Sequence, residues 1–166
     1  MRLKPIFTII FLCLFAINGV AQKPEIKFGN VSEKDFAPKV YSIDSNANAI
    51  VIADIGVSKL VGNTKGWFSL EFKRYRRVRL LNKNGFDIAT EEIPLYSEGQ
   101  VEEQISSLKA VTYNLENGKV VETKLEKGNI FKDRLSKNWV VKKFTFPNIK
   151  EGSVIEFEYT ITSDYL

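Results

Sequence analysis

The sequence contains no histidine, and its single cysteine, Cys13, lies in an apolar stretch near the N-terminus. The rest of the chain therefore has no Ser-His-Asp or Cys-His nucleophile pair and no zinc site of the usual Cys/His kind. It also has no disulfide framework, so packing must stabilise the domain. Carboxylate, lysine, tyrosine or serine chemistry remains, but no motif indicates it. We therefore expect no enzyme activity in this chain, and no metal or cofactor.

The first 21 residues have the pattern of a secretory signal peptide. Arg2 and Lys4 precede an apolar run over residues 6–17, and small residues follow up to Ala21. The apolar run is shorter than the roughly 20 residues that span a bilayer, so we expect no transmembrane segment after cleavage. Cys13 follows a leucine where lipoprotein processing needs a small residue, which argues against a lipid anchor.

Cleavage after residue 21 would leave one exported domain over residues 22–166, in the periplasm, on the cell surface or outside the cell. The full chain has 24 Lys and Arg against 20 Asp and Glu, a net charge of +4. Arg2 and Lys4 leave with the signal peptide, so the remaining excess of positive charge is small. Neither this charge nor an exported location favours a nucleic-acid partner.

The remaining residues have the patterns of an all-β fold. The clearest alternation runs over residues 155–162, where Ile, Phe and Tyr alternate with Glu and Thr, which predicts one buried face and one wet face. Residues 49–57 form a near-continuous β-branched run, which predicts a strand buried on both faces. Residues 126–138 have no clear period, so we expect a loop with a helical turn there. No helix longer than about two turns is indicated.

Two Asn-Gly pairs between β-prone runs predict hairpins, because a type I′ turn needs positive φ at both central residues. The first pair, at residues 84–85, would join two long strands within residues 67–95. The second, at residues 117–118, places Glu116 opposite Lys119 as an ion pair, with an apolar pair behind it. Hairpins of this kind favour an antiparallel β-sandwich or an open barrel.

Shorter polar stretches predict local turns. Ser32, followed by Asp35 three residues later, is expected to cap one helical turn. Asp44 begins a polar run that predicts an Asx turn leading into a strand, and residues 40–43 before it are expected to form a short strand. A further turn is expected over residues 97–100.

The order of several motifs resembles a known bacterial family. They are an Asp-led strand entry at residues 44–51, an Arg-rich strand closing on Leu-Asn-x-x-Gly at residues 74–85, a strand pair at residues 108–121 and the sequence FPNIKEGSVIE at residues 146–156. Together these motifs resemble the β-sandwich domain of unknown function that lies N-terminal to transglutaminase-like domains in exported proteins. The resemblance covers roughly residues 28–166.

This resemblance implies a non-catalytic domain that gives structural or binding support to a transglutaminase-like module. Catalysis would belong to a downstream Cys-His-Asp triad, so no catalytic residue is carried over to this chain. One alternative is the N-terminal part of a papain-like transglutaminase or peptidase whose catalytic domain lies beyond Leu166. Another is a module that binds glycan or an envelope component. If the chain ended at Leu166, its last strand would leave an unpaired edge and favour association.

A basic run over residues 73–79 is the first candidate surface for a partner. Its arginines are Arg74, Arg76, Arg77 and Arg79. In a strand, Arg77 and Arg79 share one face, and Arg74 and Arg76 share the other.

The predicted hairpin at residues 84–85 would place Arg77 opposite Glu92 and Arg76 diagonal to Glu91. These neighbours favour a solvated, charge-paired strand face. Docking onto an acidic partner, an adjacent domain, anionic lipid or glycan is the alternative.

Trp67 and Trp139 are the second candidate surface. With Tyr75, Tyr96 and Tyr113 they would form a sugar-stacking platform if the strands brought them together. Aromatic side chains in strands mostly pack in the core or across strands, so we favour packing over sugar binding.

Overall fold

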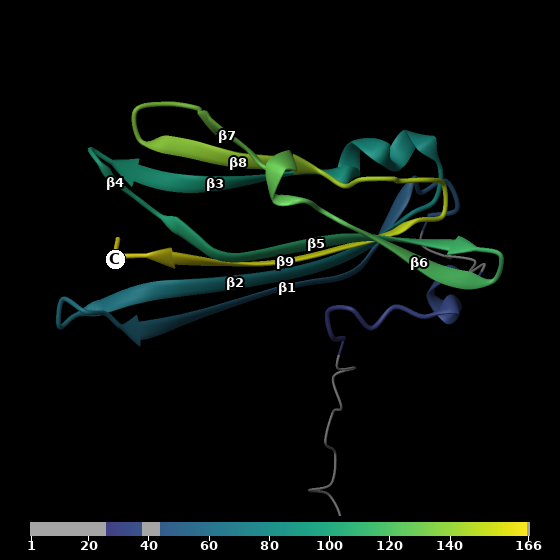
Figure 1. Ribbon diagram of the computed structural model, residues 1–166, viewed down its shortest axis with the longest axis horizontal. Helices are drawn as coiled ribbons and strands as arrows, with labels where there is room; N and C mark the ends of the chain where they lie inside the picture. Colours follow the sequence, from purple (N-terminus) through teal and green to yellow (C-terminus); the bar gives the residue numbers. More distant parts are fainter. Residues whose placement is uncertain (1–25, 38–43, 166) are drawn as a thin grey trace, which may run out of the picture.

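The computed structural model describes residues 26–37 and 44–165, which fold into two antiparallel sheets packed face to face (Figure 1). The five-stranded sheet has the order β1-β2-β9-β5-β6, and the four-stranded sheet has the order β4-β3-β8-β7. The strands are β1 (Ala49–Gly62), β2 (Phe68–Leu80), β3 (Thr90–Glu98), β4 (Val101–Glu102), β5 (Gln104–Glu116), β6 (Lys119–Lys124), β7 (Phe131–Arg134), β8 (Trp139–Thr145) and β9 (Val154–Ser163). The all-β prediction is confirmed.

Within the described residues, three short 3₁₀ helices connect or precede these strands: η2 (Glu33–Phe36), η3 (Lys83–Ala89) and η4 (Lys127–Asn129). None of the helices in the described residues is long and apolar enough to cross a membrane. The predicted signal peptide over residues 1–21 and the predicted strand over residues 40–43 lie outside the described residues.

The core lies between the two sheets. Val78 on β2 and Phe157 on β9 face Leu95 on β3 and Phe144 on β8 across this space. Burying an apolar side chain of this size contributes about 1.5–3 kcal/mol. A second, smaller cluster lies on the outer face of the five-stranded sheet, where the N-terminal segment covers it; its buried residues are Phe36, Val111, Tyr113 and Val154.

The position of β9 corrects one prediction and refines another. β9 is paired on both sides, with β2 and with β5, so it leaves no unpaired edge. Its apolar residues face the core, as the alternation predicts. The opposite face is not uniformly wet, however, because the N-terminal segment covers part of it and Glu156 is buried there.

The predicted hairpin at residues 84–85 is wrong. These residues lie in η3, whose N-cap Asn82 accepts a hydrogen bond from the backbone N–H of Asn84 at 2.9 Å. Gly85 serves a close approach of two backbones: a Cβ at this position would lie 2.5 Å from the carbonyl oxygen of Asn48. The chain thus crosses from one sheet to the other here, and β2 and β3 belong to different sheets.

The second Asn-Gly hairpin is confirmed. Asn117 and Gly118 have φ values of 50° and 75°, as a type I′ turn requires, and Glu116 lies opposite Lys119 in the ladder. The ion pair differs from the prediction: Glu116 pairs with Lys150 at 2.6 Å. Backbone register follows from the local sequence, whereas long side chains take the partner that the fold brings within reach.

Two more predictions need correction. β1 is an edge strand rather than a strand buried on both faces, and its Val57 side chain is 55% exposed. β-branched residues stabilise an exposed edge as well as a buried strand, so composition does not separate the two cases. Residues 126–138 contain the short strand β7 in addition to the expected helical turn η4. The sequence did not predict β7 because its four residues are too few to show a period.

The local turn predictions hold. Ser32 and Asp35 form a capping box at η2. The backbone N–H of Asn46 donates to Asp44 at 2.8 Å, as in an Asx turn. β3 and β4 are joined by a tight turn around Gly99, whose φ is 63°.

Candidate functional site

The four candidate arginines all lie on β2, and strand alternation separates them into two pairs. Arg77 and Arg79 point to the outer face of the five-stranded sheet, where their guanidinium groups bond to the N-terminal segment. Arg74 and Arg76 point toward the other sheet, where they meet Glu91 of β3. The predicted division into two faces is therefore confirmed, and the run forms no single cationic strip.

Arg77 belongs to a buried network centred on Glu156. Their exposed fractions are 4% and 1%, and the Arg77 Nη2 lies 2.8 Å from Glu156 Oε1. The hydroxyls of Tyr75 and Tyr113 donate to the same carboxylate at 2.6 and 2.9 Å, and the backbone N–H of Gly29 donates at 3.0 Å. These hydrogen bonds and the Arg77 charge stabilise the buried Glu156 carboxylate.

The network sets the protonation of its members. Burial and the Glu156 carboxylate raise the pKa of Tyr75 and of Tyr113, so both phenols stay protonated and donate. Burial works against charge on Arg77, but its bonds to Glu156 outweigh that cost, and the pKa of Arg77 is raised. The network is therefore a fixed set of donors around one anion.

Arg77 and Arg79 also hold the N-terminal segment against the sheet. Arg77 Nη2 donates to the carbonyl of Lys27 at 3.0 Å, and Arg79 donates to the carbonyls of Phe36 and Ala37, both at 2.7 Å. The predicted pairing of Arg77 with Glu92 is wrong, because β2 and β3 are not neighbours in one sheet.

Arg74 and Arg76 form a second cluster with Asp54 of β1 and Glu91 of β3, which we call the arginine cluster. Arg74 donates to both oxygens of Asp54 at 2.9 Å and to Glu91 at 3.2 Å. Arg76 Nη1 lies 3.5 Å from Glu91. The predicted proximity of Arg76 and Glu91 is confirmed, although the two residues meet across the two sheets and not along one hairpin. Arg74 also lies over the Phe157 ring at 5.7 Å.

The two carboxylates of the arginine cluster respond differently to it. Hydrogen bonds from Arg74 lower the pKa of Asp54, which is exposed to water. Burial raises the pKa of Glu91, although the charges of Arg74 and Arg76 oppose the change. The cluster therefore closes one flank of the sandwich with charges that largely answer one another.

The two tryptophans are exposed and lie on separate elements. Trp67 immediately precedes β2 and is 67% exposed, with its ring 6.1 Å from that of Phe68. Trp139 begins β8, is 44% exposed and packs edge to face with Tyr96 at 5.5 Å. Tyr75 and Tyr113 are buried at Glu156. The five aromatic residues therefore do not form one platform.

β2 and β8 nevertheless begin at the same end of the sandwich, where the chain reaches its C-terminal residues (Figure 1). Trp67 therefore lies near Asp164, and Trp139 meets Tyr165 through Tyr96. Lys65, in the turn that leads to Trp67, pairs with Asp164 at 2.8 Å. Tyr165 packs on Tyr96 with centroids 4.8 Å apart and donates to the carbonyl of residue 101 at 3.0 Å.

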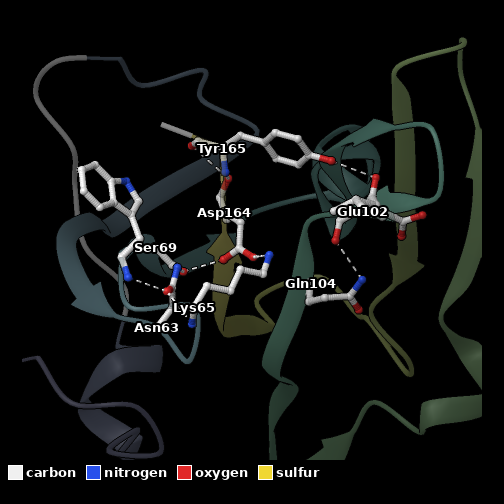
Figure 2. Close-up of polar contacts among 10 residues, drawn as sticks. Asn63, Lys65, Ser69, Glu102, Gln104, Asp164 and Tyr165 are labelled. Atoms are coloured by element: carbon white, nitrogen blue, oxygen red, sulfur yellow. Dashed lines mark hydrogen bonds and ion pairs between the residues drawn. The ribbon is translucent and has the colours of Figure 1, made fainter.

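Asp164 is the polar centre of this end. Ser69 donates to it at 2.5 Å, and Asn63 donates to Ser69 at 3.2 Å (Figure 2). Hydrogen bonds from Lys65 and Ser69 lower the pKa of Asp164. The same Asn63 accepts hydrogen bonds from the backbone N–H groups of Lys65 and Trp67. These bonds fasten the last described residues to the turn between β1 and β2.

On the flank opposite the arginine cluster, a groove of about 670 Å³ lies between β5 and β7. We call it the lysine groove. Its walls include Ile105, Leu108, Ile130 and Phe131, and four lysines surround them: Lys109, Lys127, Lys132 and Lys142. No acidic residue lines it. A volume of this size is in the range of ligand sites in proteins.

Sequence reasoning missed the lysine groove because its residues come from three strands and the η4 region. Lys132 lies opposite Lys142 in the β7–β8 ladder, but the pairing is visible only once β7 is recognised as a strand. In the described part of the chain, no three acidic side chains gather in a way that would hold a metal ion.

A family model for a domain of unknown function with a solved structure, DUF3857, matches residues 68–165. The chain belongs to the DUF3857 family. The match covers more than half of the sequence and includes β2 to β9, which are all the strands of the two sheets except β1. The expected membership of a family of domains of unknown function is confirmed, and the family itself assigns no activity.

One solved structure is similar in fold to this DUF3857 chain. It is named as a "putative protease" from Parabacteroides distasonis, and it matches 70% of this chain with a TM-score of 0.50 and 11% sequence identity. The match spans 23% of that protein's length, so this chain corresponds to under a quarter of it. No curated protein matches the sequence.

Proposed function

We propose that this DUF3857 chain is an exported, non-catalytic β-sandwich domain that supports a transglutaminase-like module by binding to it. Its buried carboxylates serve the fold: donors surround Glu156 on several sides, and Glu91 is held by two arginines. The observation that carries the proposal is the lysine groove, an apolar depression with four lysines and no acidic residue in its lining. Lys109 and Lys132 pair with carboxylates outside the lining, and in the described residues Lys127 and Lys142 form no ion pair.

The share of the similar solved structure that this fold occupies also favours a supporting role. A protein with the same fold in part of its chain bears the name of a protease, and the matched part makes up only 23% of it. A fold of this kind therefore occurs as one part of a longer chain. On this proposal, the transglutaminase-like module is encoded either by the same gene, beyond the Leu166 codon, or by a second gene.

The proposal is tested by adding the full chain to a transglutaminase-like module from the same genome. At a concentration about 100-fold above Kd, binding should raise the module's free energy of unfolding by about 2.7 kcal/mol, because the domain binds only the folded module. Urea denaturation monitored by fluorescence measures the change, and size-exclusion chromatography measures the complex.

The chain alone should not hydrolyse amide substrates or transfer acyl groups. Turnover by the chain alone would overturn the non-catalytic part of the proposal. Separate elution of the two proteins, with unchanged stability of the module, would overturn the supporting role.

A further inference from the structure

We propose that the lysine groove binds an extended, acidic and partly apolar peptide segment, which adds as a strand to the unpaired edge of β5. This inference rests on the proposed supporting function and names the chemistry of the contact. It is argued from four properties of the groove: a free strand edge, the direction of the backbone along it, exposed apolar walls, and positive charge at Lys127 and Lys142. Lys109 already pairs with Glu158 at 3.0 Å, so it does not carry the argument.

The edge of β5 is unpaired along the groove. β6 pairs with β5 only over residues 111–116, and Leu125 extends that contact by one hydrogen bond to the carbonyl of Ala110 at 2.9 Å. Residues 104–109 have β9 on one side, but none of the described strands lies on the other. Five consecutive β5 residues, 105–109, line the groove, so this edge of the strand borders it.

The backbone direction follows from the bond at Ala110. Its carbonyl points toward β6 and away from β9. Residues two apart in a strand present their N–H and C=O groups at the same edge. Leu108 therefore directs its backbone N–H and C=O into the groove, where an added strand would pair with both. Main-chain bonds of this kind provide affinity in strand-addition complexes.

The walls are apolar and open. Ile105, Leu108 and Ile130 pack on the core with one side and line the groove with the other. Phe131, at the start of β7, is 66% exposed. Covering these side chains with an apolar residue of a bound segment removes apolar surface from water, which favours binding. Alternate residues of an extended segment would lie on these walls.

The charge identifies the occupant as acidic. Lys132 and Lys142 are direct neighbours across the β7–β8 ladder, and like charges in this position repel each other. Lys132 reaches Glu102 at 2.8 Å, outside the groove lining. In the described part of the chain, Lys127 and Lys142 form no ion pair. A carboxylate between Lys132 and Lys142 would bind both and remove their repulsion.

The probe for the binding test is a fluorescein-labelled seven-residue peptide that alternates Glu and Val. It should bind the full chain saturably, as measured by fluorescence anisotropy. Two control peptides separate the contributions to binding. The Lys–Val counterpart reverses the charge, and an N-methylated Glu–Val peptide keeps the charge but loses donors for the strand edge. Both should bind at least about tenfold more weakly, since a tenfold change corresponds to 1.4 kcal/mol.

The protein variants test the location. Lys132→Gln combined with Lys142→Gln should weaken binding of the Glu–Val peptide by about tenfold, a loss of 1.4 kcal/mol. Lys143→Gln is the matched control, because Lys143 follows Lys142 on β8, points to the other face and pairs with Glu92. It should change Kd by less than about twofold. Amide NMR shifts should move at Leu108, and circular dichroism should show that all variants are folded.

Three outcomes would overturn the inference. Equal binding of the Glu–Val and Lys–Val peptides would reject charge recognition. An unchanged Kd in the double variant would reject the location. Self-association of the double variant, without peptide binding by the wild type, would show that the two lysines only prevent the exposed strand edges of two protein molecules from pairing.

Failure of the inference is distinguishable from failure of the supporting function. If the transglutaminase-like module binds the wild type and the double variant equally, the groove inference fails and the supporting function remains. If the acidic peptide binds through Lys132 and Lys142 but the module does not bind, the groove is a peptide site and the supporting function fails.

Discussion

The arginines of β2 and the lysines of the groove carry the same charge, but their surroundings differ. Arg77 is buried against Glu156, and Arg74 and Arg76 share Asp54 and Glu91. The lysine groove has no acidic residue in its lining. The first region uses positive charge to join parts of the fold, whereas the second leaves positive charge beside an open apolar surface.

The difference follows partly from the chemistry of the two side chains. A guanidinium group is planar and donates several hydrogen bonds in fixed directions, which suits a buried carboxylate with other donors around it. An ammonium group is a compact, strongly hydrated charge at the end of a flexible chain, and it is easily kept at the surface. A basic run in a strand therefore indicates internal pairing as readily as a binding surface, and the location of the acidic residues decides between them.

The largest effect is expected when the Glu156 network loses its carboxylate. Glu156→Ala would leave Arg77 buried without a counter-ion and two tyrosine hydroxyls without their acceptor, so the free energy of unfolding should fall by about 3–5 kcal/mol. Urea denaturation measures this loss.

Glu158→Ala is the control for that variant. Glu158 lies two residues further along the same face of β9, and its partners Lys73 and Lys109 are exposed. Its removal should cost less than about 1 kcal/mol. Similar losses in the two variants would show that the Glu156 network is not special.

A smaller effect should appear in the dependence of stability on pH, with opposite signs at two glutamates. Burial works to raise the pKa of Glu158, but hydrogen bonds from Lys109 and Lys73 outweigh it, and the pKa is lowered from its ordinary 4.5. Its stabilisation is present above 4.5 and is lost as pH falls through the folded-state pKa. The stability advantage of the wild type over Glu158→Gln should therefore shrink below pH 4.5.

Glu91 should show the reverse. Burial raises its pKa above 4.5, so the folded protein takes up a proton there before the unfolded chain does. Stability relative to Glu91→Gln should then rise as pH falls through the folded-state pKa toward 4.5. Urea denaturation from about pH 7 to about pH 3.5 measures both differences, each expected below about 1 kcal/mol. If the stability differences of the two variants from the wild type changed with pH in the same direction, the opposite pKa shifts of Glu91 and Glu158 would be contradicted.

The smallest effect compares two adjacent lysines of β8. Lys142→Gln removes the repulsion with Lys132 and should stabilise the protein by about 0.2–0.5 kcal/mol. Lys143→Gln removes the ion pair with Glu92 and should destabilise it by about the same amount. Thermal denaturation at low ionic strength measures both, and high salt should reduce both. Destabilisation by Lys142→Gln would mean that this lysine supports the fold.

The sequence predicts features that depend on a few neighbouring residues. The turn at Asn117 and Gly118 and the capping box of Ser32 and Asp35 are such features, because backbone torsions and short hydrogen bonds decide them. The alternation of β9 likewise identifies its core face. The same reasoning fails at Gly85, where a glycine between β-prone runs serves a close contact with Asn48, far away in the sequence.

The candidate site was predictable only in part. The sequence indicates that the β2 arginines lie on two faces and that a glutamate lies near Arg76. It does not indicate Glu156 as the partner of Arg77, because β9 follows β2 by more than 70 residues. The lysine groove was not predictable, since its residues meet only after both sheets have formed.

The sequence by itself thus determines the all-β class, the alternation of side chains between the two faces of a strand, and turns such as that at Asn117 and Gly118, since these follow from chain geometry over a few residues. Tertiary structure decides which strands are neighbours, and therefore which charged side chains form ion pairs. Arg77 finds Glu156 because β2 and β9 pair, whereas Lys142 meets Lys132 because β7 and β8 pair. Charge pairing acts over a few ångströms, and in this fold those distances are set by strand order and not by position in the sequence.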